Sequence, residues 1–349
     1  MLGDFSIVEG EYLHDILDQP RALDDTMAGL EDGKELRQLA GRLQKGKFKF
    51  VVLTGMGSSF HALHPLNLEL IQAGLNAVMV ETSELIHYQS RLFDPKNLIV
   101  AVSQSGHSAE IIRLLKSNRG KSAIIGITNT PDSPLATSAE ACIVTRAGKE
   151  FSVSCKTYMT SLIAVRWLAD VIRGCDLRRT LRELKKASPA VKEYLGNWKK
   201  HVQELGERLR NARQLFLVGR GASLAAVGTG ALIIKEADHF PAEGMSSAAF
   251  RHGPFEMIGD ETFVAVFAGE GKARELNRGL FSDIRENQGQ AEWIACDSEF
   301  SPFALPEVPR SFSPVVEILP AQMITLALGA QVGREAGRFS LCSKVTTKE

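Results

Sequence analysis

The feature that most constrains the fold is an internal repeat. The segment LTGMGSS at 53–59 matches LVGRGAS at 217–223, and each follows a short apolar run, at 48–53 and at 214–218. A buried strand that ends in Gly-x-Gly and leads into a helical segment is typical of the first βα unit of a parallel sheet. Because 349 residues exceed the length at which one core usually stops growing, we expect two domains of similar architecture.

Strand-like and helix-like segments alternate through both halves. The other apolar, strand-like runs lie at 75–80, 97–102, 122–128, 141–145, 262–267 and 292–295. The helical patterns lie at 11–19, ending before Pro20, at 108–117, at 177–210 around a boundary near Pro189, and at 320–332. This alternation predicts an α/β protein whose sheets are mainly parallel, with helices on both faces.

Composition excludes several classes of protein. Hydrophobic residues make up 44% and charged residues 23%, which is typical of globular domains. Lys plus Arg (41) balances Asp plus Glu (41), so we expect no general attraction to nucleic acid or to an anionic membrane. No stretch approaches the roughly 18 apolar residues of a spanning helix, and no signal-peptide pattern begins the chain, so we expect a cytoplasmic protein.

The spacing of the cysteines does not match a metal-binding motif. The five cysteines are Cys142, Cys155, Cys175, Cys296 and Cys342, which are widely spaced and contain no CxxC pair. This spacing argues against a disulfide framework and against a structural zinc site. We therefore expect no structural metal, and the acid–base chemistry expected below needs neither a metal nor an organic cofactor.

The strongest local signal is the segment VSQSGHS at 102–108, between an apolar strand and a helical pattern. It supplies Ser103, Gln104, Ser105 and Ser108. The carboxyl ends of parallel strands line the ligand crevice, and a helix N-terminus offers unpaired N–H groups to an anion. We interpret the segment as a phosphate cradle. The alternative is that Ser105 or Ser108 is only a helix N-cap, which would need one hydroxyl rather than three.

The first Gly-x-Gly segment offers two further hydroxyls, on Ser58 and Ser59. The segment resembles half of a dinucleotide-binding fingerprint, but Phe60 stands where the third glycine would be. Glu81 comes close to the acidic residue that a nicotinamide site needs. An oxidoreductase is thus disfavoured but stays open, and the two serines fit better as ligand donors.

Two segments of the second half could carry proton transfer. Glu236 lies in the segment 234–244, and His252 lies in the segment FRHGP at 250–254. A glutamate and a histidine in loops of one domain are a reasonable base and acid for moving a proton between adjacent carbons. Spacing alone gives equal weight to this role and to a plain helix end followed by a turn.

In order along the chain, these segments resemble the SIS (sugar isomerase) domain family, most closely the isomerase half of glutamine–fructose-6-phosphate aminotransferases. The matching landmarks are Gln19-Pro20, Gly57 to Ser59, Ser103 to Gly106, the loop 147–157, Lys235-Glu236, His252 to Pro254, and Ser343 to Thr346. The resemblance implies two tandem SIS domains, each a flavodoxin-like or Rossmann-like, mainly parallel sheet. It divides the chain into an N-terminal helical segment (1–30), a first domain (31–185), a helical linker (186–205) and a second domain with a tail (206–349).

The resemblance also implies the roles of the candidate residues. The phosphate and sugar would be bound by Ser58, Ser59, Ser103, Gln104, Ser105, Ser108, Val153 and Ser154. Glu236 would shuttle a proton between C1 and C2 of the open-chain sugar. His252 would assist ring opening from across the interface of a homodimer. Lys344, on a C-terminal tail that covers the site, would form a Schiff base with a ketose.

The chain also departs from the family pattern. Ile233 and Ala249 replace a lysine and a glutamate near the catalytic positions, and His107 replaces an acidic residue of the phosphate loop. The loop at 154–156 is one residue shorter, and the tail differs in length. No glutaminase domain precedes residue 1, so glutamine-dependent synthesis is not expected from this chain.

Three hypotheses follow. The first is a phosphosugar isomerase that deaminates or deglycates an amino-sugar phosphate, such as glucosamine 6-phosphate or a fructosamine 6-phosphate. The second, favoured by Ile233 and Ala249, is a non-catalytic sugar-phosphate sensor, although the chain shows no helix-turn-helix extension or basic arm. The third and weakest is the nucleotide-dependent oxidoreductase.

Overall fold

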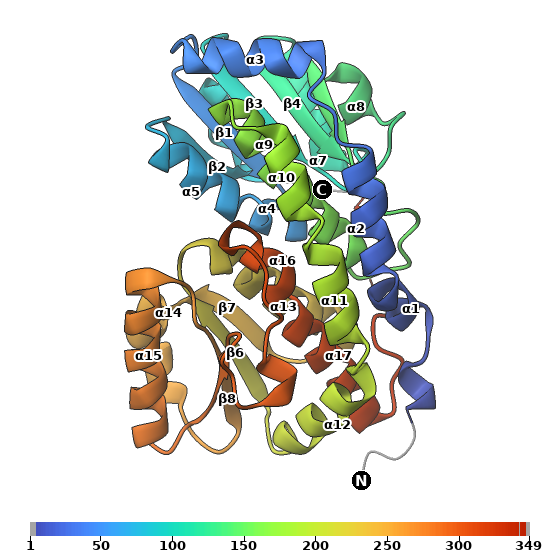
Figure 1. The fold of residues 1–349 in the computed structure, drawn as a ribbon, viewed down its shortest axis with the longest axis vertical. Helices are drawn as coiled ribbons and strands as arrows, with labels where there is room; N and C mark the ends of the chain where they lie inside the picture. Colours follow the sequence, from blue (N-terminus) through green and yellow to red (C-terminus); the bar gives the residue numbers. More distant parts are fainter. Residues whose placement is uncertain (1–4, 342, 347–349) are drawn as a thin grey trace. The chain divides into compact units, whose positions relative to one another are not determined.

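A computed structural model describes residues 5–341 and 343–346, which divide into two compact units, each with its own parallel sheet (Figure 1). Unit 1 comprises Met1–Pro20, Phe151–Cys155 and Ala187–Leu341; unit 2 comprises Arg21–Glu150, Lys156–Lys186 and Cys342–Glu349. The two parallel sheets confirm the predicted α/β architecture. The domain boundaries implied by the family resemblance stay a prediction.

Unit 2 contains a five-stranded parallel sheet in the order β2-β1-β3-β4-β5. Its strands are β1 (Phe50–Gly55), β2 (Ala77–Glu81), β3 (Asn97–Val102), β4 (Ala123–Thr128) and β5 (Ala141–Val144). The strand order reverses between β1 and β3, as in flavodoxin-like sheets. All six residues of β3 are buried, which explains why an unbroken apolar run identified this strand in the sequence.

Helices cover both faces of the sheet of unit 2. The helices are α2 (Gln19–Ala28), which begins in unit 1, α3 (Lys34–Gln44), α4 (Ser58–His61), α5 (His64–Gln72), α6 (Thr82–His87), α7 (Ala109–Asn118), α8 (Pro134–Ser138), α9 (Lys156–Arg173) and α10 (Leu177–Leu184). One face packs against α6, α7 and α8 through a core that includes Val52, Ile99 and Leu114. On the other face α9 packs against α3, α5 and α10. This layering is the predicted one.

Unit 1 contains a four-stranded parallel sheet in the order β7-β6-β8-β9. Its strands are β6 (Gln214–Gly219), β7 (Ala242–Ser246), β8 (Thr262–Phe267) and β9 (Gln290–Ile294). The sequence analysis treated the β7 segment as a helix end and a turn, which is wrong. The sequence AEGMS carries no β-branched residue, and Gly244 is needed because an added Cβ would lie 2.4 Å from the Val227 carbonyl oxygen.

The helices of unit 1 are α1 (Glu11–Leu17), α11 (Ala187–Leu195), α12 (Trp198–Arg208), α13 (Leu224–Asp238), α14 (Ser247–Arg251), α15 (Gly271–Glu286), α16 (Ser313–Glu317) and α17 (Leu319–Val332). A short 3-10 helix lies in unit 2 at Ser90–Leu92, and others lie in unit 1 at Ser6–Val8, Gly221–Ser223, Pro254–Met257, Ser301–Phe303 and Arg310–Phe312. In unit 1, α13 packs on β6 and β7 and against α17, which also contacts α12. A second core, which includes Phe216, Phe250 and Trp293, lies beneath α14 and α15.

One helical stretch, Arg310–Val332, is long and apolar enough to cross a membrane by length and composition. The sequence analysis expected no such stretch. Within the fold, 83% of its most apolar window is buried, so it belongs to the core of unit 1.

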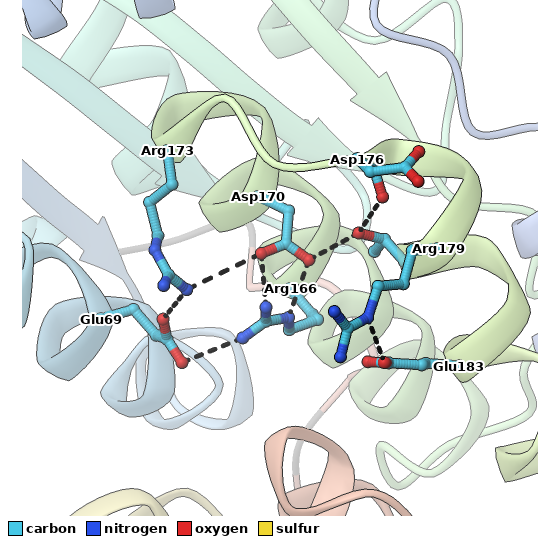
Figure 2. A network of polar contacts seen from close by, with 8 residues as sticks. Glu69, Arg166, Asp170, Arg173, Asp176, Arg179 and Glu183 are labelled. Atoms are coloured by element: carbon cyan, nitrogen blue, oxygen red, sulfur yellow. Dashed lines mark hydrogen bonds and ion pairs between the residues drawn. The ribbon is translucent and has the colours of Figure 1, made fainter.

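A network of ion pairs fixes α9 within unit 2 (Figure 2). The Asp170 carboxylate, with 4% of its side chain exposed, pairs with the Arg166 guanidinium and accepts a hydrogen bond of 2.8 Å from the Thr180 hydroxyl. Arg166 and Arg173 donate to opposite oxygens of Glu69 on α5, at 2.9 and 2.7 Å. The network therefore links α5, α9 and α10.

We expect Asp170→Ala to lower the free energy of unfolding by about 3 kcal/mol, because Arg166 and Thr180 then lose a buried partner. Urea denaturation measures this value. Arg179→Ala is the matched control in Figure 2, since the side chain of Arg179 is 74% exposed in its pair with Glu183, and it should leave the free energy of unfolding nearly unchanged. Equal losses in the two variants would contradict this account.

Candidate functional site

The loop after β1 is shaped by two glycines. A Cβ on Gly55 would lie 3.0 Å from backbone atoms of Ser59, Phe60 and Val102, so a side chain is excluded there. Gly57 has a φ of +51° and directly precedes α4. The turn places Ser58, which is 9% exposed, and the half-buried Ser59 at the start of that helix.

The loop 103–108 after β3, here called the serine loop, uses each of its hydroxyls as a hydrogen-bond acceptor. Ser103 accepts from the Gly106 N–H at 3.1 Å, and Ser105 accepts from the His107 N–H at 3.2 Å. Ser108 is the N-cap of α7 and accepts from the Ile111 N–H at 3.4 Å. The helix-cap interpretation is thus correct for Ser108. A hydroxyl that accepts a backbone N–H keeps its own hydrogen to donate, so capping is compatible with anion binding.

The serine loop is held by the segment that follows β4. The Gln104 carbonyl accepts hydrogen bonds from the Asn129 N–H at 3.0 Å and from the Thr128 hydroxyl at 3.1 Å. Gly106 has a φ of +63°, and an added Cβ would lie 2.2 Å from Oγ of Ser133. Both the backbone conformation and the available space therefore require glycine at position 106.

The structure brings these two loops together at the carboxyl edge of one sheet. Strands β1 and β3 are direct neighbours, paired from Phe50↔Asn97 to Thr54↔Ala101. The strand order reverses at this pair, which is where ligands bind in open α/β sheets. The N-terminus of α7 adds the positive end of a helix dipole. This edge of unit 2 has the features of a site for a small anion.

The C-terminal tail, residues 343–346, is attached to the same unit. The Lys344 ammonium pairs with the carboxylate of Glu150, whose side chain is fully buried. The Thr346 carbonyl accepts a 3.1 Å hydrogen bond from the N–H of Ala109, the first residue of α7. The tail thus contacts the helix that begins at the serine loop.

Competing effects set the pKa of Glu150. Burial raises this pKa, but the Lys344 charge and hydrogen bonds from the N–H of Thr157 (2.9 Å) and its hydroxyl (2.6 Å) lower it. The balance leaves the pKa below its ordinary value, so Glu150 is ionised at neutral pH. The sequence analysis quoted the loop around Glu150 without assigning this residue. A glutamate inside a hydroxyl-rich loop was the signal that could have found it.

The other candidate residues lie in unit 1. Val153 is fully buried, and Ser154 is partly exposed. Glu236 lies near the C-terminal end of α13 and is partly exposed, while His252 is exposed directly after α14. Ile233 and Ala249, which depart from the family pattern, differ in burial. Ile233 is completely buried, and Ala249 is exposed.

Glu236 shares its surroundings with a buried tyrosine. Burial raises the pKa of Tyr12 well above its ordinary value, and the nearby Cys155, Asp238 and Glu236 raise it further. The Tyr12 hydroxyl lies 3.4 Å from the hydroxyl of Thr325 on α17. Tyr12 therefore stays protonated beside the candidate base.

The sheet of unit 1 has its own strand-order reversal, between β6 and β8. There the Ser223 hydroxyl donates a 2.8 Å hydrogen bond to Glu317 on α16. Burial raises the pKa of Glu317 to about 7, with the Ser223 hydrogen bond lowering it and the Glu270 charge raising it. The sequence analysis did not identify Glu317, which lies just before the apolar helical pattern predicted at 320–332.

Comparison with known proteins identifies the family. The SIS domain matches residues 47–170 and 208–328, which together cover more than half of the chain. The chain belongs to the SIS domain family. The two matched regions correspond to the two parallel sheets, so the predicted tandem arrangement of SIS domains is confirmed.

Curated relatives of this SIS protein include aminotransferases. It is 29% identical over 351 residues to glutamine–fructose-6-phosphate aminotransferase of Pyrococcus horikoshii, and 28% identical over 363 residues to that of Streptomyces coelicolor. These alignments cover 97% of this chain but only 57% and 58% of the relatives. The chain spans little more than half the length of the curated relatives it matches.

Solved structures share the fold. The C-terminal domain of glucosamine-fructose-6-phosphate aminotransferase from Francisella tularensis aligns with a TM-score of 0.80 and 20% identity, covering 93% of this chain and 97% of that one. Glucosamine-6-phosphate deaminase from Thermotoga maritima aligns with a TM-score of 0.73 and 18% identity, covering 97% and 100%. At these identities the likeness shows the fold alone.

We expect Lys344→Met to lower the free energy of unfolding by about 3 kcal/mol at pH 7, because it leaves a buried carboxylate without its cation. In the parent protein the lowered pKa of Glu150 contributes stability above its unfolded value of about 4.3, and this contribution is lost as the pH falls through the folded pKa. The loss caused by the substitution should therefore shrink at pH 4, where Glu150 of the variant can be protonated.

Urea denaturation at the two pH values checks this expectation. Lys200→Met is the matched control, because Lys200 pairs with Glu204 at 3.7 Å with 64% of its side chain exposed. It should cost less than about 0.5 kcal/mol at either pH. A Lys344→Met effect that is equally large at pH 4 would argue against the ion pair as its source.

Proposed function

We propose that this SIS protein is a phosphosugar isomerase that acts on an amino-sugar phosphate, coupling aldose–ketose isomerisation to deamination or deglycation. The observation that carries the proposal is the pair of hydroxyl-rich loops at the neighbouring ends of β1 and β3. These loops suit an anion that is bound through hydroxyl and backbone donors. A sugar phosphate is such a ligand, and it also needs the donors and acceptors that hydroxyl side chains provide.

Phosphate binding is assigned to the serine loop and to the start of α4. The donors are Ser58, Ser59, Ser103, Gln104, Ser105 and Ser108, with Val153 and Ser154 near the sugar. Because three serine hydroxyls already accept backbone N–H groups within the serine loop, their hydrogens are the ones available to phosphate oxygens. Anchoring the phosphate fixes the distance from the anchor to C1 and C2, which converts binding energy into orientation.

The chemistry needs one base near C1 and C2. With glucosamine 6-phosphate, His252 assists ring opening and Glu236 moves a proton from C2 to C1. The product of this step is a 2-imine, which water hydrolyses to fructose 6-phosphate and ammonia. With a fructosamine 6-phosphate the proton moves from C1 to C2, and hydrolysis of the C1 imine releases glucose 6-phosphate and the amine. Proton transfer by a positioned carboxylate is ordinary general acid–base catalysis.

Lys344 is assigned to the ketose end of the reaction. A lysine forms a Schiff base only after its ammonium has lost a proton. Glu150 is its ion-pair partner and holds two hydrogen bonds from Thr157, so it can accept that proton without losing all its partners. We therefore add Glu150 to the proposed site as the group that positions Lys344 and takes its proton.

The relatives support the choice of substrate class. Their names specify fructose 6-phosphate as a substrate of the aminotransferases, and one structural neighbour is named glucosamine-6-phosphate deaminase. Both names concern six-carbon sugars that carry a phosphate and gain or lose nitrogen. The balanced charge of the chain agrees with a small-molecule substrate rather than nucleic acid or a membrane surface, and with a cytoplasmic location.

A non-catalytic sugar-phosphate sensor is the second candidate. The apolar side chain of Ile233 is fully buried on the helix that carries Glu236, and Ala249 removes a carboxylate three residues before His252. Both substitutions reduce the charge available near the proposed base. A sensor would bind the same ligands through the serine loop without turning them over.

We expect Glu236→Gln to lower ammonia or amine release at least a hundredfold, because an amide cannot carry the proton between C1 and C2. The measurement is product release from glucosamine 6-phosphate and from a panel of fructosamine 6-phosphates. Glu243→Gln, an exposed glutamate on β7, is the matched control and should keep the parent rate. Thermal stabilisation by these ligands without turnover would favour the sensor.

We also expect two inactive variants to restore each other's activity if His252 acts across the interface of a homodimer. Each site of an isologous dimer would then combine Glu236 of one protomer with His252 of the other. Mixing Glu236→Gln with His252→Asn subunits should regain about a quarter of the parent activity, since half of the dimers are mixed and each mixed dimer has one intact site. No recovery after subunit exchange would place both residues in one protomer.

A further inference from the structure

Unit 1 contains a pocket of about 460 Å³ lined by residues at the ends of α12, α13 and α17 and in the connection from α12 to β6. In Figure 1 these three helices lie side by side, and the contacts of α17 with α12 and α13 agree with the view. The volume falls within the range of small-molecule sites. No residue assigned to the proposed sugar-phosphate site lines it.

The pocket contains a buried carboxylate. Asp238, the last residue of α13, is 8% exposed, and neither of its carboxylate oxygens has a hydrogen-bond partner among the described residues. One of these oxygens faces Gly329 on α17, where an added Cβ would lie 3.4 Å from it. Buried polar groups are nearly always satisfied, so an unpaired carboxylate on a residue that lines a cavity indicates a ligand with hydrogen-bond donors.

The electrostatic surroundings of Asp238 agree with this interpretation. Burial raises the pKa of Asp238 well above its ordinary value, and Arg334 opposes that rise. The guanidinium of Arg334 donates to the Asp238 backbone carbonyl at 3.1 Å rather than to its carboxylate. A cationic group placed in the pocket would stabilise the ionised carboxylate and would itself be stabilised.

The rest of the pocket supplies the opposite charge and an apolar wall. Arg210 and Arg213, both exposed, line it from the segment between α12 and β6. Phe240 and Val332 add apolar surface, and Glu207 adds a second acidic side chain. The lining therefore carries a buried acidic group and two exposed basic groups.

We propose that this pocket binds a small molecule that carries a primary amine and an anionic group, with the amine at the Asp238 carboxylate and the anionic group at Arg210 and Arg213. The anionic group is a carboxylate or a phosphate, since guanidinium groups bind both. The pocket is distinct from the serine loop of unit 2. The proposal therefore stands or falls independently of the proposed catalytic function.

Isothermal titration calorimetry on the full chain tests the proposal with four probes. The two-ended probes are O-phosphoethanolamine and 4-aminobutyrate, and the one-ended probes are ethanolamine and inorganic phosphate. At least one two-ended probe should bind about tenfold more tightly than either one-ended probe, because only it engages both ends of the pocket. Tighter binding of O-phosphoethanolamine identifies a phosphorylated amine, and tighter binding of 4-aminobutyrate identifies an amino acid.

Variants assign the binding to this pocket. Asp238→Asn and the double variant Arg210→Ala/Arg213→Ala should each weaken the better probe about tenfold or more. Val332→Trp narrows the pocket at an exposed position, 68% exposed, and should weaken binding without touching the buried carboxylate. Asp260→Asn, at an exposed aspartate of the same unit, is the control and should bind as the parent does.

Two results would overturn the proposal. One is the absence of saturable binding of both two-ended probes to the parent chain at millimolar concentrations. The other is binding that persists in Asp238→Asn and in Val332→Trp but is lost in Ser105→Ala, which would assign the probe's phosphate to the serine loop.

Discussion

The backbone hydrogen bonds between β1 and β3, from Phe50↔Asn97 to Thr54↔Ala101, hold the two hydroxyl-rich loops of unit 2 at one edge of its sheet. Because β2 flanks β1 on its other side, the chain leaves β1 toward one face of the sheet and leaves β3 toward the opposite face. The two connections diverge, and in open α/β sheets ligands bind at such a point of divergence. The hydrogen bonds inside the two loops can shape a single site because the pairing of β1 with β3 already holds the loops next to each other.

Glycines and serines shape that edge of the sheet in different ways. Gly55 and Gly106 allow close contacts that a side chain would disturb, while Ser103 and Ser105 accept N–H groups of the loop and Ser108 accepts an N–H of α7. A loop stabilised in this way is preorganised, so a phosphate would not have to order it on binding. The same hydroxyls thus serve the fold as acceptors and are available to a ligand as donors. This dual use explains why the helix-cap and ligand-binding interpretations do not compete.

The sequence predicted the features that depend on neighbouring residues, but it missed those that depend on contacts between residues far apart in the chain. The strands with unbroken apolar runs, such as β3 and β8, were predicted at their observed bounds, because every residue of these strands is buried and the sequence shows this as a continuous apolar run. Strand β7 was missed, because its place beside β6 depends on the close approach of α13 at Gly244 rather than on its own side chains. The pairing of Glu150 with Lys344 joins residues 194 positions apart, so no local pattern encodes it. Similarly, Asp238 reads as an ordinary polar residue at a helix end until the packing of α12 and α17 buries it.

The tail connects two parts of unit 2, the buried carboxylate of Glu150 and the first turn of α7. Lys344 compensates the buried Glu150, and two residues later the Thr346 carbonyl accepts the N–H of Ala109 in the first turn of α7. That turn is continuous with Ser108, the last hydroxyl of the serine loop. An anion bound at the serine loop would draw on the same N-terminal N–H groups of α7 that hold the tail. Because Glu150 is fully buried, removal of the tail would take the Lys344 cation from a carboxylate in a low-dielectric interior. The tail is therefore held to unit 2 at two points, at Glu150 through an ion pair and at the first turn of α7 through a backbone hydrogen bond.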